Sequence, residues 1–471
     1  MRHSDEIAAY AQSCRQAYLD DLSELIAIPS VSEELFQASD QAPFGLHCVE
    51  ALEKMMELCG RYGLPTRTIG NVIGIAEYGE GPRELDIVAH LDVQPAGPGW
   101  TTPPFALTID GDTAYGRGAS DDKGPALAAL YAVRALKDLG IPLRKKVRLV
   151  FGTGEEYGIS DIHYYTDKEA PPPFMFTPDH TFPVVNGSKA SYTARLSAAF
   201  EPMGGDGAAV LHVKGGDNRG AVPGICTAQV RGAPRPLMEQ AVKDARMRTG
   251  LPITLEENDG MYTLVSRGVS THAVKADQGK SALTAMLELL CHLPLGNTRG
   301  HCLLRRFAEM FPHGDVAGRE SGLFMEDTLS GGSLYNVGIF RYQPDGLEAQ
   351  LRVTLPVTAK GEQFVPLFLE RASRAGLRVD QGHFSSGRYV PLDDPYLKKL
   401  LASYTCHTGQ EAYGIIAGGG SYASYFPRGV AFGCEPDGVD TRMHGAQEFV
   451  SIENMLRSIA IFAQAILEIC G

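Results

Sequence analysis

The stretch ELDIVAHLDV, residues 84–93, sets the fold expected for this chain. It is a short, β-rich apolar run that ends in a histidine and an aspartate, and a similar run, NVIGIAEYG, precedes it at 71–79. A strong helical pattern, GPALAALYAVRALKDLG, follows at 124–140, and a second buried strand, KKVRLVFGTGEE, follows at 145–156. Strand, helix and strand in this order predict an α/β fold, with parallel members in the sheet and helices on its faces.

At 471 residues the chain is too long for one ordinary hydrophobic core, so two domains are expected. The pattern changes near residue 187, where strands such as SYTARLSA begin to alternate polar and apolar residues, as in a sheet with one solvated face. The helix and apolar-strand pattern returns at DPYLKKLLASYTCHTGQ. We therefore expect a discontinuous α/β domain of residues 1–186 and 386–471, with a mostly parallel mixed sheet, and an inserted α+β domain of residues 187–385.

Amphipathic helices are predicted at both ends of the chain. Residues 5–27 carry apolar positions at helical spacing, with Ser4 as the N-cap. The closing helix is SIENMLRSIAIFAQAILEI, residues 451–469. Asp5 and Glu6 stand where a basic leader sequence would lie, so no secretion signal is expected.

The composition argues against several classes of partner and site. The formal net charge of -13 argues against a nucleic-acid binder, which needs clustered Lys and Arg. No uninterrupted run of about 18 apolar residues occurs, so no membrane partner is expected. The nine cysteines form no CxxC pair, which argues against a Cys-rich zinc site and favours reduced thiols in the cytoplasm.

Residues suited to chemistry stand at the turn-like ends of predicted strands, in AHLD, GRGASDDKG, GTGEE, TPDH and TRMHGAQE. In an open α/β sheet the crevice at the carboxyl ends of the strands binds ligands, so these five segments could converge there. His90 and Asp92 point to the same side of an extended segment, and the carboxylate can then accept a bond from the imidazole N–H. The alternative is a surface histidine beside an incidental aspartate.

The acidic pairs allow two interpretations each. Asp121 and Asp122 precede a helix and could cap it, although one aspartate could also bridge two metal ions with its two oxygens. Glu155 and Glu156 directly follow a strand, and adjacent carboxylates repel unless a cation stabilises them. One glutamate would then bind metal and the other would act as a general base, whereas the alternative is a solvated acidic loop. His444 taken alone is typical of an ordinary loop histidine.

The order and spacing of these segments resemble the M20 family of co-catalytic metallopeptidases, most closely its PepV-like dipeptidase branch. The resemblance covers both segments of the α/β domain and part of the insert. It rests on AHLDVQPAGPGWTTPPF, YGRGASDDKGPALAAL, GTGEEYGISD, FTPDHTFPVVNGSKA, STHAVKADQGKSA, GGGSYASYFPRGVAFG and MHGAQE. It implies a zinc-peptidase-like catalytic domain, with the insert as a lid domain.

The resemblance also implies a site for two divalent metal ions. Its ligands would be His90, Asp121, Glu156, Asp179 and His444. Asp121 would bridge, with His90 and Asp179 on one metal and with Glu156 and His444 on the other. These ligands offer only nitrogen and oxygen, so Zn²⁺ is expected, and Mn²⁺ or Co²⁺ would also be acceptable.

Three catalytic residues are implied in the same way. Asp92 would orient His90, and Glu155 would be the general base that takes a proton from the attacking water and passes it to the leaving amine. His272, in the insert, would stabilise the tetrahedral oxyanion.

The substrate-binding positions depart from the family pattern. The lid of the family often carries an arginine that holds the substrate carboxylate, but Thr354 stands there, and Arg352 on the same strand face is the candidate substitute. Gly220 replaces a usual asparagine, with Asn218 close by, and Ser424 replaces an arginine of the dipeptidase branch. The candidate substrate-binding residues are Arg352, Asn218 and Gly419.

The expected function is metal-dependent hydrolysis of the amide bond of dipeptides. An alternative within the same fold is an N-acyl amino-acid amidohydrolase of the deacetylase, desuccinylase or aminoacylase type, which the altered arginine position leaves open. A non-catalytic metal-binding or ligand-binding protein is the alternative of another class, and Glu155 argues against it, because it would bind no metal and has little use outside proton transfer. The expected partner is a small peptide substrate, and the chain would be a monomer or a homodimer.

Overall fold

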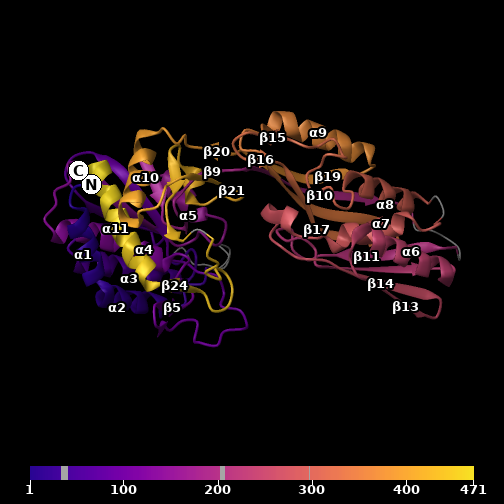
Figure 1. Cartoon of the computed structure of the whole chain (residues 1–471), viewed down its shortest axis with the longest axis horizontal. Coiled ribbons are helices and arrows are strands. Elements are labelled where there is room, and N and C mark those ends of the chain that lie inside the picture. Colours follow the sequence, from indigo (N-terminus) through magenta and orange to yellow (C-terminus); the bar gives the residue numbers. More distant parts are fainter. Residues whose placement is uncertain (33–40, 202–206, 296–297, 437) are drawn as a thin grey trace. The chain divides into compact units, whose positions relative to one another are not determined.

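The computed structural model describes residues 1–32, 41–201, 207–295, 298–436 and 438–471. The chain divides into two compact units. The first comprises Met1–Gly187 and Tyr389–Gly471, and the second comprises Ser188–Arg388. The first unit is therefore discontinuous in sequence, and each unit has its own sheet and helices (Figure 1).

The first unit is built on a nine-stranded mixed sheet. β3 pairs in parallel with β6 and with β7, and β7 pairs in parallel with β22, whereas β2 pairs antiparallel with β1 and β6. The strand order is β1 (Thr66–Ile69), β2 (Ile73–Tyr78), β6 (Lys146–Gly152), β3 (Arg83–His90), β7 (Phe174–Thr177), β22 (Gly429–Ala431), β9 (Val184–Ser188) and β20 (Arg388–Tyr389), with β21 (Gly414–Ala417) beside β9. The predicted α/β class is confirmed, with parallel strands at the centre of the sheet.

Two small sheets lie in the same unit. One is antiparallel, in the order β24 (Phe449–Ser451), β5 (Thr113–Tyr115) and β4 (Thr108–Asp110). The other is the parallel pair of β8 (His180–Thr181) and β23 (Cys434–Glu435). Both connect loops that follow strands of the main sheet to segments near the C-terminus.

The central strands are buried on both faces, as their apolar sequences predict. In β3, Leu85, Ile87 and Ala89 belong to a large core, and Val88 belongs to a smaller core that also holds residues of α5 and η2. The large core also takes residues from six helices, α1 (Ser4–Ser13), α2 (Arg15–Ile26), α3 (Leu46–Arg61), α4 (Lys123–Asp138), α10 (Pro395–Thr408) and α11 (Ile452–Cys470). The other described helices of this unit are α5 (Ser160–Thr166) and the 3₁₀ turn η2 (Tyr422–Tyr425).

The N-terminal segment departs from the prediction of one helix over residues 5–27. It forms two helices, α1 and α2, separated at Cys14. The reason is tertiary packing, since α1 packs mainly against α11 and α2 against α4. The prediction of Ser4 as N-cap is also wrong, because His3 occupies that position in a left-handed conformation and the Ser4 hydroxyl donates to the Met1 carbonyl.

The closing helix α11 begins after Ser451, whose side chain accepts a hydrogen bond from the backbone N–H of Asn454. Most of its residues are buried in the large core. Across the part of the chain that the structure describes, none of the helices is long and apolar enough to cross a membrane.

The second unit is an eight-stranded antiparallel sheet covered by helices. The alternating burial along β10 agrees with the pattern of its sequence, with one face in the core and one face solvated. The strand order is β13 (Ile253–Asn258), β14 (Met261–Arg267), β12 (Ile225–Arg231), β11 (Ala209–Gly215), β17 (Leu334–Gln343), β18 (Gly346–Leu355), β10 (Ala190–Ala199) and β19 (Arg378–Ser385). Its other elements are α6 (Arg235–Thr249), η1 (Ala273–Gln278), α7 (Ala282–Cys291), α8 (Arg299–Met310), α9 (Gly361–Arg374) and the short pair β15 (Glu326–Asp327) and β16 (Gly331–Gly332).

Phe462→Ala should lower the free energy of unfolding of the first unit by about 3–5 kcal/mol, because truncating a buried aromatic ring leaves a cavity. The Phe462 ring, in α11, packs against the rings of Phe176, Phe182 and Phe432. Urea unfolding followed by the fluorescence of the single tryptophan, Trp100, reports on this unit.

Leu46→Ala is the matched control, since Leu46 is 71% exposed in the same unit. It should change the free energy of unfolding by less than about 0.5 kcal/mol. Equal losses in the two variants would contradict the assignment of the Phe462 ring to the core.

Candidate metal centre

The candidate residues come from segments that follow neighbouring strands at one edge of the main sheet. His90 is the last residue of β3, and Glu155 and Glu156 follow β6. Asp179 follows β7, and Asp121 lies just before α4. Because β6, β3 and β7 are adjacent and parallel, their carboxyl ends meet at one edge, which is where open α/β sheets bind ligands.

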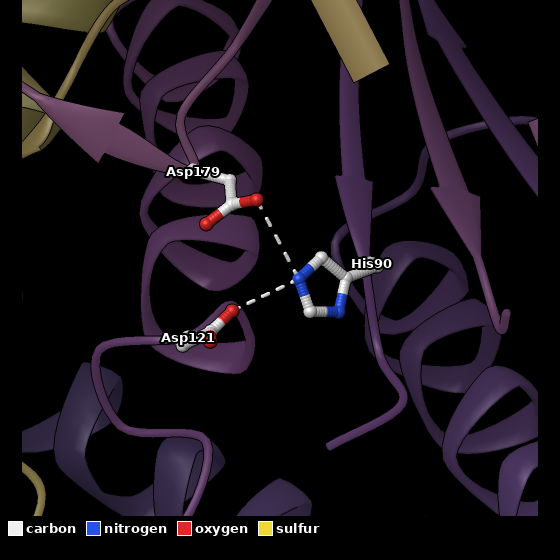
Figure 2. Close-up of side chains that lie close together, drawn as sticks. All are labelled: His90, Asp121 and Asp179. Carbon is white, nitrogen blue, oxygen red and sulfur yellow. Dashed lines mark hydrogen bonds and ion pairs between the residues drawn. The ribbon is translucent and has the colours of Figure 1, made fainter. Parts of the chain in front are cut away.

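His90, Asp121 and Asp179 form the first cluster. The Nε2 atom of His90 lies 3.0 Å from Oδ1 of Asp121 and 3.7 Å from Oδ2 of Asp179. Figure 2 shows both carboxylates turned toward this single ring nitrogen. One ligand atom from each of the three residues lies within 4.8 Å of the others. The three side chains can therefore coordinate one ion.

Asp121, Glu156 and His444 form the second cluster. The Nε2 atom of His444 lies 2.8 Å from Oδ2 of Asp121 and 3.4 Å from Oε2 of Glu156. Asp121 thus directs one oxygen to each histidine, and its carboxylate is shared between the two clusters. A carboxylate in this position can bridge two cations, because each oxygen has free lone pairs. The structure brings all five candidate ligands together.

Asp92 is buried, but its main partners differ from the expected one. The Nδ1 atom of His90 lies 2.9 Å from the backbone oxygen of Asp92 and 3.5 Å from its carboxylate. The carboxylate accepts hydrogen bonds from the backbone N–H groups of Glu155, at 3.2 Å, and Glu156, at 3.0 Å. Asp92 therefore orients His90 chiefly through its carbonyl, and its side chain fixes the turn that carries the two glutamates.

Asp122 stands at the N-cap position of α4 but makes no side-chain cap bond. Its Oδ2 atom accepts a hydrogen bond from the backbone N–H of His90 at 3.0 Å. The capping interpretation is therefore wrong for Asp122, because its carboxylate is used to hold the end of β3. Asp121, the other member of the pair, lies in both clusters.

Burial of several carboxylates at one edge raises their pKa values. Burial raises the pKa of Glu155 well above its usual range, and the negative charges of Asp179 and Asp92 add to this effect. The pKa of Glu448 is raised to about 7 by burial and by the charge of Asp121. The protein alone therefore holds these acids in their charged form only at a cost in free energy.

The pKa values of the two histidines are raised as well, but by their contacts with the carboxylates and not by burial. Burial lowers the pKa of His90, but hydrogen bonds to Asp121 and Asp179 outweigh it and leave the pKa well above the usual value. Hydrogen bonds to Asp121 and Glu156 raise the pKa of His444 to about 10. Protonated histidines thus supply the positive charge that the carboxylates require in the protein by itself.

The donor set fits divalent cations. The Oε1 atom of Glu156 is buried and has no hydrogen-bond partner among the described residues, which leaves it available to an ion. Each cluster offers three protein ligands of nitrogen and oxygen, as catalytic zinc sites do when they keep one position open for water or substrate. A cation would also replace the protons on the histidine rings as the source of positive charge.

Three supporting residues were missed by the sequence analysis. Gln94 donates from Nε2 to Oε2 of Glu156 at 2.8 Å. The Tyr422 ring meets the His90 ring edge-on, with centroids 6.2 Å apart, and its hydroxyl donates to Asp161, whose carboxylate accepts from the backbone N–H of Gly154 at 2.8 Å. The Gly-rich run at 418–423 was the available signal for Tyr422, but the sequence analysis used it only for the family resemblance and for Gly419. Gly419 itself is exposed.

The remaining candidates lie in the second unit. His272 precedes η1, and its Nδ1 atom accepts a hydrogen bond from the backbone N–H of Val274 at 3.3 Å. A Cβ atom on Gly220 would lie 4.0 Å from His272 Nε2 and 3.3 Å from Asn218 Oδ1, so the glycine leaves space between these two atoms. The Asn218 Oδ1 atom accepts from the backbone N–H of Gly220 at 2.7 Å.

Arg352 lies on β18, on the same strand face as Thr354. Burial and the neighbouring charge of Arg219 lower its pKa. Arg352 in turn lowers the pKa of His272, to which burial contributes most. Thr354 is buried, so the position of the missing family arginine is filled by a short side chain inside the sheet face.

Comparisons with known proteins agree over nearly the whole chain. The family model for peptidase family M20/M25/M40 matches residues 87–468. The Beta-Ala-Xaa dipeptidase of Lactobacillus delbrueckii subsp. lactis is 34% identical over 461 residues, which cover 98% of this chain and 97% of that protein.

Solved structures show the same fold at low sequence identity. Human carnosine dipeptidase 1 has a TM-score of 0.58 and 16% identity, and covers 100% of this chain and 99% of its own. The dipeptidase Dug1p of Saccharomyces cerevisiae has a TM-score of 0.58 and 14% identity, and covers 99% of each chain. The chain belongs to the M20/M25/M40 family of peptidases.

Proposed function

We propose that this peptidase is a metal-dependent dipeptidase. The observation that carries the proposal is the shared carboxylate of Asp121, which directs one oxygen to His90 and the other to His444. The whole-length similarity to a Beta-Ala-Xaa dipeptidase supports short peptides as the substrate class. Under this proposal the first unit is the catalytic domain and the second is the lid domain that binds substrate.

The proposed centre holds two divalent cations, with Zn²⁺ preferred because both imidazole and carboxylate ligands suit it. His90, Asp121 and Asp179 would hold one ion, and Asp121, Glu156 and His444 would hold the other. When bound, the pair would polarise the scissile carbonyl and lower the pKa of the attacking water.

Glu155 is the proposed general base. Its carboxylate would take a proton from the attacking water and deliver it to the leaving amine nitrogen. Its burial and the raised pKa suit this task, since a carboxylate with an ordinary pKa would hold the proton too weakly at neutral pH. Asp92 helps to position the base, because its carboxylate accepts a hydrogen bond from the backbone N–H of Glu155.

His272 is the proposed donor to the oxyanion of the tetrahedral intermediate. Its Nδ1 atom already accepts a hydrogen bond from Val274, so the neutral ring carries its proton on Nε2. Burial and the charges of Arg352 and Lys275 lower its pKa, which keeps the ring neutral and the Nε2–H available. Arg352, Asn218 and Gly419 remain the proposed contacts for the rest of the substrate.

The proposed compartment is the cytoplasm. All nine cysteines are free thiols, and most of them are buried, which suits a reducing environment.

A substrate screen tests the assignment. The purified full chain, loaded with Zn²⁺ or Mn²⁺, would be assayed against a panel of dipeptides and a panel of N-acyl amino acids, with metal content per chain measured in parallel. Turnover of dipeptides with two metals per chain is the expected result. Turnover of the N-acyl panel alone would assign the chain to the amidohydrolase alternative, and metal binding without any turnover would assign it to the non-catalytic one.

Glu155→Ala should keep two metals per chain but lower kcat by at least about 10²–10⁴-fold, because the proton acceptor is lost while the metal ligands remain. Metal analysis together with steady-state kinetics on a dipeptide checks this. Glu53→Ala, an exposed glutamate on α3, is the control and should leave both values unchanged. Loss of metal from the Glu155 variant would instead identify Glu155 as a ligand.

His272→Ala should lower kcat by about 10²–10³-fold with little change in KM, since the lost hydrogen bond acts on charge that develops only in the transition state. His212→Ala is the matched control, because His212 is exposed on β11 in the same unit. A rise in KM at unchanged kcat would show that His272 contributes to ground-state binding and not to the oxyanion.

A further inference from the structure

Glu448 is a fully buried carboxylate beside the candidate metal centre that the mechanism above does not use. It lies four residues after His444, just before β24. One of its oxygens, Oε1, accepts hydrogen bonds from three backbone N–H groups, those of Gly118 at 3.1 Å, Ser120 at 2.9 Å and Asp121 at 3.1 Å. A single oxygen therefore holds the loop that ends in the shared ligand.

Arg117 is the partner of this carboxylate and is 1% exposed. Its Nη1 atom donates to Oε2 of Glu448. Its Nη2 atom donates to the carbonyl of Pro95, at 3.2 Å, and to the carbonyl of Gly445, at 3.1 Å. The guanidinium thus joins three segments that are far apart in sequence.

Each of these contacts lies next to a candidate ligand. Gly445 directly follows His444, which has a left-handed backbone conformation with φ of 61°. Pro95 directly follows Gln94, whose side chain donates to Glu156. The Glu448–Arg117 pair therefore contacts the backbone of Asp121 and the residue next to His444. It also contacts the residue next to Gln94, which holds Glu156.

A buried ion pair is a poor source of stability, because desolvating both charges offsets much of their attraction. Hydrogen bonds reduce this cost, and the Glu448 carboxylate receives four donors. The Nε atom of Arg117 is buried and has no hydrogen-bond partner among the described residues, so part of the cost remains. What the pair offers is fixed geometry, since the loops on which it acts carry no regular secondary structure of their own between residues 116 and 122 or 439 and 448.

We propose that Glu448 and Arg117 are positioning residues that hold Asp121 and His444 at the spacing required for metal binding. This inference rests on the proposed metal site. The competing interpretation is a pair that only stabilises the fold, and the two differ in what they predict for metal affinity.

Glu448→Gln tests the proposal in the full-length protein. The amide keeps the size of the side chain and one oxygen for the backbone donors, but places an NH₂ group against the Arg117 guanidinium. The apparent affinity for Zn²⁺, measured by competition with a chromophoric chelator on metal-free protein, should fall about 10–100-fold, as it does when residues that support metal ligands are changed. Excess Zn²⁺ should restore part of the lost dipeptidase turnover.

Asp86→Asn is the matched control. Asp86 is also fully buried and bonded to an arginine, Arg83, but it lies on β3 toward the end of the strand opposite to His90. This variant should lose stability in urea unfolding while its Zn²⁺ affinity stays unchanged. Loss of stability with unchanged Zn²⁺ affinity in Glu448→Gln as well would overturn the proposal and leave a purely structural pair.

Arg117→Lys covers the case in which Glu448→Gln fails to fold. Lysine keeps the positive charge beside Glu448 but cannot also reach the carbonyls of Pro95 and Gly445 with a planar fork. Its Zn²⁺ affinity should fall about tenfold, and an unchanged affinity would again overturn the proposal. A wild-type protein that bound no metal would overturn the proposed function together with this inference, and that result differs from wild-type binding with unaffected variants.

Discussion

The constraint on which the site depends is the gathering of buried negative charge at one edge of the sheet. Asp121, Glu156 and Asp179 meet there with Glu155, at positions fixed by strand ends and by the start of α4. Carboxylates this close repel one another unless positive charge is supplied. In the protein alone, the protons on His90 and His444 supply this positive charge. The pKa values of both rings are raised because the nearby carboxylates stabilise the protonated form. Two divalent cations would supply the positive charge more fully.

The supports of the ligands are shared between elements. The backbone carbonyl of Asp92 contacts the His90 ring at Nδ1. The Asp92 carboxylate accepts hydrogen bonds from the backbone N–H groups of Glu155 and Glu156. The proposed base and the proposed ligands therefore cannot move independently of each other. Tyr422 adds a second connection, because it packs on the His90 ring and reaches the backbone before Glu155 through Asp161. A site with such supports is pre-organised, which is what a centre that acts by electrostatics requires.

The elements with strong local patterns could be predicted from the sequence. Apolar runs such as residues 84–93 and 145–156 became buried central strands, because strands covered on both faces have few polar positions. The features that failed depend on tertiary contacts. The helix break at Cys14 arises because α1 and α2 pack against two different helices. The Asp122 side chain does not cap α4, because it accepts a hydrogen bond from the backbone N–H of His90. The pairing of Arg117 with Glu448 spans 331 residues, and a sequence of one chain carries no local signal for such a contact.

The two units also differ in how freely their site residues can vary. In the first unit each candidate ligand shares a hydrogen bond or an ion pair with another, so changing one disturbs several buried charges at once. In the second unit Arg352 is half-buried and Thr354 is buried, but both lie on the face of β18 opposite to the core residues Leu351 and Val353. A change of either side chain therefore leaves that core intact. Two departures from the family pattern, Thr354 and Gly220, lie in the second unit. The third, Ser424, lies in η2 of the first unit and replaces none of the five candidate ligands. The candidate metal ligands are therefore under a tighter physical constraint than the positions that depart from the family pattern.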